Sequence, residues 1–182
     1  MPDLDNRIED ALAALQHLHR EVDREAEALS RRHAARLQCR RGCSLCCIDG
    51  ITVFEIEAER IRDRHAGLLK VGWPSPRGAC AFLDDHGACR IYESRPYVCR
   101  TQGLPLRWIE DDDAAVRVEY RDICPLNDVR EEPLETLPPE ACWSVGHYEG
   151  RLRDLQLSYG GDPPRRIPLR DLFVRPDDDE DS

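Results

Sequence analysis

Cysteine is the residue type in this sequence that is best suited to chemistry. The 182-residue chain contains nine: Cys39, Cys43, Cys46, Cys47, Cys80, Cys89, Cys99, Cys124 and Cys142. An odd number of thiols, with no apolar export segment in residues 1–20, argues against a disulfide framework. We therefore expect an unexported, cytoplasmic protein whose thiolates bind metal. Buried free cysteines that act as small apolar residues are the alternative, and this suits the isolated Cys142 better than the four cysteines within residues 39–47.

Thiolates are soft ligands that favour Zn(II), Cu(I) and iron–sulfur clusters. A tetrahedral site takes four of them, commonly as two pairs from separate segments. Adjacent cysteines such as Cys46 and Cys47 point apart, so we expect them to serve neighbouring sites or different irons of one cluster. Eight cysteines are candidate metal ligands, which allows two four-ligand sites or one cluster with spare thiols. These candidates are Cys39, Cys43, Cys46, Cys47, Cys80, Cys89, Cys99 and Cys124.

The first block also has the spacing Cys39-x3-Cys43-x2-Cys46, which matches the motif that holds the open-site [4Fe-4S] cluster of radical S-adenosylmethionine enzymes. Those enzymes need a β/α barrel or most of one. Here only 135 residues follow Cys47, and Pro/Gly-rich and acidic segments interrupt them. We therefore disfavour a radical enzyme.

A second block runs from Cys80 to Cys99, where an Asp85-His-Gly turn should bring Cys80 and Cys89 close together. With Cys39–Cys47 and Cys124, this block resembles the bacterial CxxCxxCC cysteine-cluster family over about residues 36–128. The most specific part is Ile91-Tyr92-x3-Arg95-Pro96-x2-Cys99-Arg100. The first gap, residues 40–42, holds three residues where the family name has two.

The resemblance implies a zinc- or iron-chelating domain. It also implies a relation to the cysteine domain of flagellin lysine N-methylase, and hence iron–sulfur-dependent methyl transfer as one activity. Independently of the family, clustered thiolates leave excess negative charge. We expect Arg95 and Arg100 to offset it and to donate hydrogen bonds toward sulfur. Ordinary surface arginines are the alternative, because 25 of the 26 basic residues are Arg.

The elements that must position these residues give an α+β fold, in which metal replaces much of the core. Residues 8–33 have apolar or small side chains at heptad spacing, which predicts a long amphipathic helix. His19 and His33 lie on this seam, where we expect them to pack rather than to bind metal. We also expect a short strand at 50–54, a helix at 55–69, a hairpin of 104–109 with 114–120, and a helix from Pro139 to about Tyr159.

These elements divide the chain into four predicted parts. They are an N-terminal helix (1–35), a cysteine-cluster metal-binding domain (36–128), a proline-rich linker with a C-terminal helix (129–176), and a disordered acidic tail (177–182). The N-terminal helix should pack on the cysteine domain or pair with a protein partner, such as a second copy in a homodimer.

The charge pattern excludes other classes of protein. The net charge is −10, but without the acidic runs Glu110–Asp113 and Asp177–Asp181 it is only −1. No broad basic face for nucleic acid is present, and no apolar run is long enough to span a membrane. The leading hypothesis is a metal-binding protein that holds zinc, iron or a [4Fe-4S] cluster, with a role in metal handling, redox chemistry or regulation. The alternatives are an iron–sulfur methyl- or electron-transfer enzyme and an adaptor that acts through the N-terminal helix.

Overall fold

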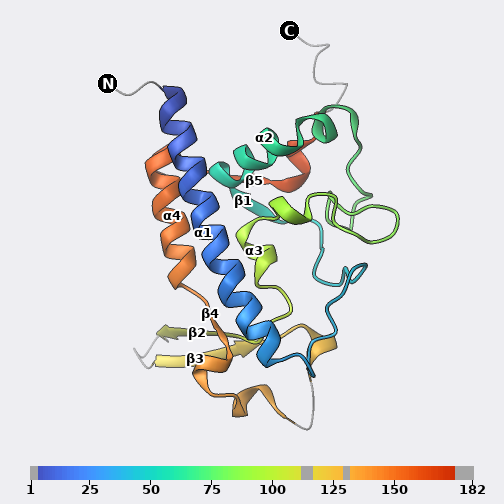
Figure 1. Ribbon diagram of the computed structural model, residues 1–182, viewed down its shortest axis with the longest axis vertical. Helices are drawn as coiled ribbons and strands as arrows, with labels where there is room; N and C mark the ends of the chain where they lie inside the picture. The colour runs from blue at the N-terminus through green and yellow to red at the C-terminus, as the bar shows by residue number, and fades with distance from the viewer. Residues whose placement is uncertain (1–3, 112–116, 129–131, 175–182) are drawn as a thin grey trace. The chain divides into compact units, whose positions relative to one another are not determined.

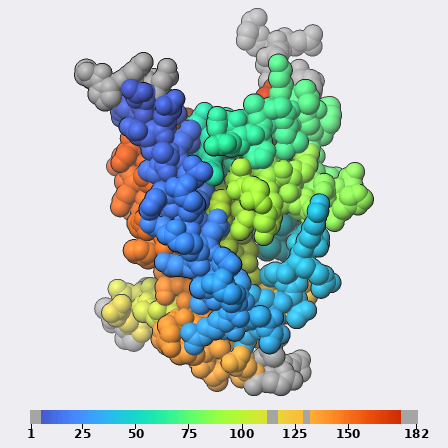
Figure 2. Space-filling view, in the orientation of Figure 1, coloured from blue at the N-terminus to red at the C-terminus, as the bar shows by residue number. Residues whose placement is uncertain are grey.

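The heptad seam becomes a single long helix, α1 (Leu4–Arg32), in the computed structural model, which describes residues 4–111, 117–128 and 132–174. The predicted seam positions Leu15, His19, Val22 and Ala26 are buried, and so is His33 just after the helix. Figure 2 shows α1 as a continuous blue band on the face in view. The periodicity therefore predicted both the helix and its buried face.

The chain forms two compact units, which we name by their residues. Unit 1 comprises residues 1–15, 40–96 and 153–182, and unit 2 comprises residues 16–39 and 97–152. Both α1 and α4 (His147–Gly160) contribute residues to each unit. Figure 1 shows these elements along the chain.

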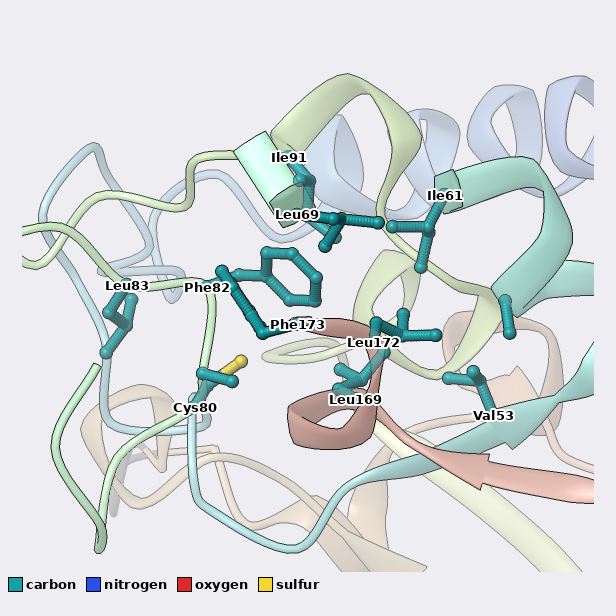
Figure 3. Close-up of a cluster of buried hydrophobic side chains, with 12 residues drawn as sticks. Val53, Ile61, Leu69, Cys80, Phe82, Leu83, Ile91, Leu169, Leu172 and Phe173 are labelled. Carbon is teal, nitrogen blue, oxygen red and sulfur yellow. The ribbon is translucent and has the colours of Figure 1, made fainter. Parts of the chain in front are cut away.

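Unit 1 contains a small two-stranded sheet and a hydrophobic core. Its elements are β1 (Thr52–Phe54), α2 (Glu55–Val71), η1 (Tyr92–Ser94), β5 (Arg166–Pro168) and η5 (Leu169–Leu172). Strands β1 and β5 are antiparallel, with Val53 opposite Ile167. The core joins α2 to η5 and to the second cysteine block, and Figure 3 shows Cys80, Phe82 and Leu83 beside Leu172 and Phe173. The C-terminal segment is therefore part of the structure that surrounds Cys80.

Unit 2 is built on a three-stranded sheet in the order β3-β2-β4. Strands β2 (Leu106–Asp111) and β3 (Arg117–Asp122) form the predicted hairpin, and β4 (Trp143–Ser144) runs parallel to β2. Short helical turns complete the unit: α3 (Tyr97–Arg100), η2 (Pro125–Asn127), η3 (Leu134–Thr136) and η4 (Pro139–Ala141). Residues 112–116 of the hairpin and the acidic tail 177–182 lie outside the described residues.

The C-terminal helix starts later than the sequence predicted. It begins at His147 rather than Pro139, because residues 143–145 join the sheet. Trp143 N–H donates to the Pro105 carbonyl at 2.7 Å, and Val145 N–H donates to the Arg107 carbonyl at 2.9 Å. Pro139–Ala141 form only the short turn η4, and these long-range hydrogen bonds take residues 143–145 out of the helix that local propensity favoured.

Together these elements confirm the expected α+β fold with a long N-terminal helix and a C-terminal helix. Within the described ranges, no helix is both long and apolar enough to cross a membrane.

Candidate metal centre

Five of the cysteines lie in unit 1, on two loops that contact each other. The first loop turns tightly, since Cys43 N–H donates to the Arg40 carbonyl and Cys47 N–H donates to the Ser44 carbonyl, both at 2.9 Å. Gly42 has a φ of +85°, a conformation in which glycine is favoured, and it permits this turn. A Cβ added to Gly87 of the second loop would lie 3.3 Å from the Gly42 carbonyl oxygen. The two loops are therefore packed backbone to backbone.

The second loop forms the predicted turn between Cys80 and Cys89. The Asp84 carboxylate accepts the His86 and Ala88 N–H groups at 2.9 and 2.8 Å, and an isolated antiparallel bridge pairs Leu83 with Cys89. This closes the loop that brings the two cysteines to the same core.

The two loops are joined next to the thiols themselves. Cys80 N–H donates to the Cys47 carbonyl at 2.9 Å. Cys80 is buried in the unit 1 core, and Cys47 and Cys89 pack against that core as partly buried residues. Cys80 lies 33 residues after Cys47 and 9 residues before Cys89 in the sequence. These three candidate ligands nevertheless contact the same hydrophobic core.

The thiols of this group differ in their electrostatics. A hydrogen bond from the Cys47 side chain lowers the pKa of Cys46 to about 6, against the opposing effect of burial. Burial raises the pKa of Cys80 and of Cys89 above the ordinary thiol value. Cys46 is therefore the thiol of this group that most readily loses its proton at neutral pH, whereas burial favours the protonated form of Cys80 and Cys89.

Arg95 lies where a counter-charge to these thiols is needed. Its positive charge lowers the pKa of Cys89 and so opposes the effect of burial. Its guanidinium carbon sits 4.2 Å above the centre of the Tyr92 ring, and its Nη1 donates to the Tyr92 carbonyl at 3.0 Å. The predicted hydrogen bond from Arg95 to sulfur stays a prediction.

Arg100 belongs to unit 2, where its side chain is only 2% exposed. Its Nη1 forms an ion pair with Asp23 of α1 at 2.5 Å. This pair anchors α3, the short helix that contains Cys99, to α1. A role of Arg100 toward the thiolates likewise stays a prediction.

Two further arginines near the unit 1 thiols escaped the sequence analysis. Arg90 lowers the pKa of both Cys80 and Cys89, and Arg170 lowers the pKa of Cys80. Arg90 directly follows a candidate ligand, so its position was a usable signal. Arg170 is 81 residues beyond Cys89 in the sequence, and no local pattern pointed to it.

Unit 2 holds Cys39, Cys99 and Cys124. The Cys39 sulfur accepts a hydrogen bond from the Asn127 amide at 3.4 Å, and Asn127 N–H donates to the Cys124 carbonyl at 2.7 Å. Asn127 is fully buried and therefore links the segments of these two cysteines. Cys99 is half-buried on α3.

Comparison with protein families matches residues 38–125 to the CxxCxxCC model, described as a "putative zinc- or iron-chelating domain". This segment belongs to the CxxCxxCC family. It includes eight of the nine cysteines, and Cys142 lies outside it. Searches of curated proteins and of solved structures found no match.

The donor chemistry of the CxxCxxCC domain fits a soft metal ion. Its cysteines form no disulfide, and in unit 1 the pKa of Cys46 is lowered to about 6 while arginine charges act to lower the pKa values of Cys80 and Cys89. Within the described residues, however, no three Cys, His, Asp or Glu side chains converge closely enough to hold one ion. The structure places Cys47, Cys80 and Cys89 of the two loops next to one core.

A cavity of about 430 Å³ lies beside Cys80, a volume in the range of small-ligand sites. Asp49, Arg77, Leu169 and Arg170 are among its lining residues. Cys80 itself forms part of the wall, so the cavity offers a route to this otherwise buried thiol.

Cys142 behaves as the sequence analysis expected of an isolated cysteine. It is 5% exposed and packs with Ile123, Leu134, Leu137 and Ala141 in a separate core cluster of unit 2. Burial raises its pKa, which keeps the thiol protonated at neutral pH. It is a packing residue of this core.

Proposed function

We propose that the CxxCxxCC domain binds zinc or iron through its thiolates, with the unit 1 cysteines as the principal site. The observation that supports this most directly is the hydrogen bond of Cys80 N–H to the Cys47 carbonyl, which holds the two cysteine loops together. Four-thiolate sites are commonly assembled from two pairs on separate segments. The ligands of this site are drawn from Cys43, Cys46, Cys47, Cys80 and Cys89, and Cys39, Cys99 and Cys124 of unit 2 are further candidates.

The charges in unit 1 favour the same function. Thiolates that surround a divalent ion leave excess negative charge, which nearby guanidinium groups stabilise. Arg90, Arg95 and Arg170 all act on Cys80 or Cys89 in this direction. These charges favour the thiolate form of Cys80 and Cys89, which is the form that binds metal.

The biological role follows from the metal. Zinc would favour a structural, regulatory or metal-handling role, whereas an iron–sulfur cluster would permit redox chemistry or methyl transfer. Nine cysteines without a disulfide suit a reducing compartment such as the cytoplasm. A homodimer through α1 would have to use its exposed surface, because Leu15, Val22 and Ala26 of the seam are buried within the chain.

Metal analysis tests the proposal. The full chain is purified anaerobically without chelator, and its zinc, iron and acid-labile sulfide are measured per chain. One or more tightly bound metal ions per chain are expected, brown with sulfide for an iron–sulfur cluster and colourless for zinc. A freshly isolated protein with neither metal and nine titratable thiols would refute the proposed function.

A further inference from the structure

The residue that fastens the two cysteine loops of unit 1 lies outside the family match. Arg170 belongs to η5, 45 residues beyond the end of the matched segment at residue 125. Its Nε and Nη2 contact Oδ1 of Asp49 at 3.0 and 2.9 Å. Asp49 is two residues after Cys47, so this ion pair holds the first loop.

The same guanidinium group also holds the second loop. Nη1 donates to the Ser75 carbonyl at 2.7 Å, and Nη2 donates to the Ala79 carbonyl at 2.9 Å. Ala79 directly precedes Cys80. The Arg170 side chain therefore bridges Asp49 and Ala79. These two residues lie beside Cys47 and Cys80, which are candidate ligands from different loops.

The Asp49 carboxylate reinforces this bridge. It accepts the N–H of Gly50 at 3.0 Å through Oδ1 and the N–H of Gly78 at 3.1 Å through Oδ2. The Asp49 side chain is 27% exposed and that of Arg170 only 12%, so the pair is largely shielded from water. Charge-assisted hydrogen bonds of this kind are stronger than neutral ones. The two side chains thus form one hydrogen-bonded unit between the loops.

We propose that Arg170 is a positioning residue of the metal site, which keeps the Cys46–Cys47 loop next to Cys80 so that thiolates of both loops can bind one metal ion. This inference rests on the proposed function. It extends the metal-binding structure beyond residues 38–125 to Arg170 of η5. Arg170 also lines the cavity beside Cys80, so its loss should open the approach to that thiol.

A purely structural role is the alternative, since η5 also packs Leu169 and Leu172 into the core. Arg166 of β5 provides a matched control. Its Nε donates to the Thr52 Oγ1 at 3.0 Å and its Nη2 donates to the Thr52 carbonyl at 2.8 Å. It thus secures the same C-terminal segment by side-chain hydrogen bonds, and none of these reaches a cysteine loop.

The test compares Arg170→Gln, Arg170→Lys and Arg166→Gln with the unaltered full chain. Zn(II) affinity is measured by competition with a chromophoric chelator under anaerobic conditions. In metal-free protein, the alkylation rate of Cys80 is followed by mass spectrometry, and thermal unfolding is recorded for every variant. Removing a group that orients metal ligands typically weakens affinity about 10–100-fold.

We expect Arg170→Gln to lose at least about tenfold in Zn(II) affinity and to alkylate faster at Cys80. Arg170→Lys should lose affinity as well, because an ammonium group cannot reproduce the planar fork that reaches both loops. Arg166→Gln should keep its Zn(II) affinity and its Cys80 alkylation rate, and its loss of melting temperature shows what loosening this segment alone does. If Arg170→Gln does not fold, Arg170→Lys is judged by the same comparison.

Two results overturn the inference, and they are distinguishable. If the Arg170 variants bind Zn(II) as tightly as Arg166→Gln does, Arg170 is only a structural residue while the proposed function stands. If the unaltered chain binds neither zinc nor iron, the proposed function fails, and the positioning role fails with it.

Discussion

The side-chain amide of Asn127 donates a hydrogen bond to the sulfur of Cys39 at 3.4 Å. The same nitrogen donates to the Gly103 carbonyl at 2.8 Å, and the amide oxygen accepts the N–H of Gln38 at 2.8 Å. One fully buried side chain thus joins the segment before the first cysteine block to the loop after α3. Because both of its polar atoms are used, Asn127 fixes the place of Cys39 in unit 2.

Replacing Asn127 by Ala should therefore destabilise the protein. The Gln38 N–H and the Gly103 carbonyl would both lose their partner, and the Gly103 carbonyl is buried. An unsatisfied buried group costs about 1–3 kcal/mol. Urea unfolding of the two proteins measures the difference. The exposed Gln102→Ala serves as the control, with an expected change within about 0.5 kcal/mol. Equal stability of the two variants would show that the Asn127 bridge does not hold the loop.

Replacing Gly103 by Ala should displace Cys39. A Cβ at this position would lie 2.5 Å from the Cys39 sulfur, and Gly103 also has a φ of +89°. The backbone conformation alone costs about 1–2 kcal/mol with a side chain, so the steric contact should add to this. We expect faster alkylation of Cys39 and a larger loss of stability than conformation alone produces.

Gly146→Ala isolates the cost of the conformation. Gly146 lies in the same unit with a φ of +119°, and an added Cβ would meet nothing within 4 Å. Thermal unfolding and mass-spectrometric alkylation are compared in the two variants. If Gly103→Ala and Gly146→Ala have the same melting temperature and Cys39 is alkylated at an unchanged rate in both, the close approach of Gly103 to the Cys39 sulfur has no consequence.

Local patterns predicted the elements whose signal lies within one segment. The heptad spacing gave α1 and its buried stripe, and the alternation of Val118 and Tyr120 with charged residues gave the β2–β3 hairpin. The Asp-His-Gly sequence gave the turn that brings Cys80 and Cys89 together. In each case the residues that determine the structure are near neighbours in the chain.

Other features depend on residues that are far apart in the sequence. The start of α4 was wrong because Trp143 pairs with Leu106 of β2, 37 residues away. The contact of Arg170 with Asp49 spans 121 residues, and that of Asn127 with Cys39 spans 88. Neither Arg nor Asn signals such a partner by its type, so the residues that hold the candidate ligands in place emerged only from the structure.

The thiols of the metal-free protein should react with iodoacetamide in an order set by their pKa values. Cys46, with a pKa of about 6, becomes a thiolate as the pH rises through 6, so its alkylation rate should level off above pH 7. Cys80 and Cys89, whose pKa values are raised above 9.0, should still be accelerating at pH 9. Peptide mass spectrometry after brief labelling at each pH gives the individual profiles.

The hydrogen bond from the Cys47 side chain is the main cause of the low Cys46 pKa. A variant without the Cys47 thiol tests this cause. In Cys47→Ala the thiolate of Cys46 loses that donor, so the midpoint of its profile should move up toward 9.0. Cys43→Ala, which removes a neighbouring thiol on the same loop, should leave the midpoint near 6. A midpoint near 9 for Cys46 already in the unaltered protein would contradict this account of the pair.

The last prediction separates the packing cysteine from the metal candidates. Cys142 is buried in the cluster formed by Ile123, Leu134, Leu137 and Ala141, and its thiol stays protonated at neutral pH. Cys142→Ser buries a hydroxyl in place of a thiol and should cost about 1 kcal/mol, with metal content per chain unchanged.

Cys46→Ser and Cys99→Ser each remove a proposed ligand. Because the free energy of metal binding also stabilises the fold, these two should lose metal and several kcal/mol of stability. The melting temperature and the metal content per chain are measured for all three variants. If all three lose the same amount of both, Cys142 does not differ from the proposed ligands, and its assignment as a packing residue is wrong.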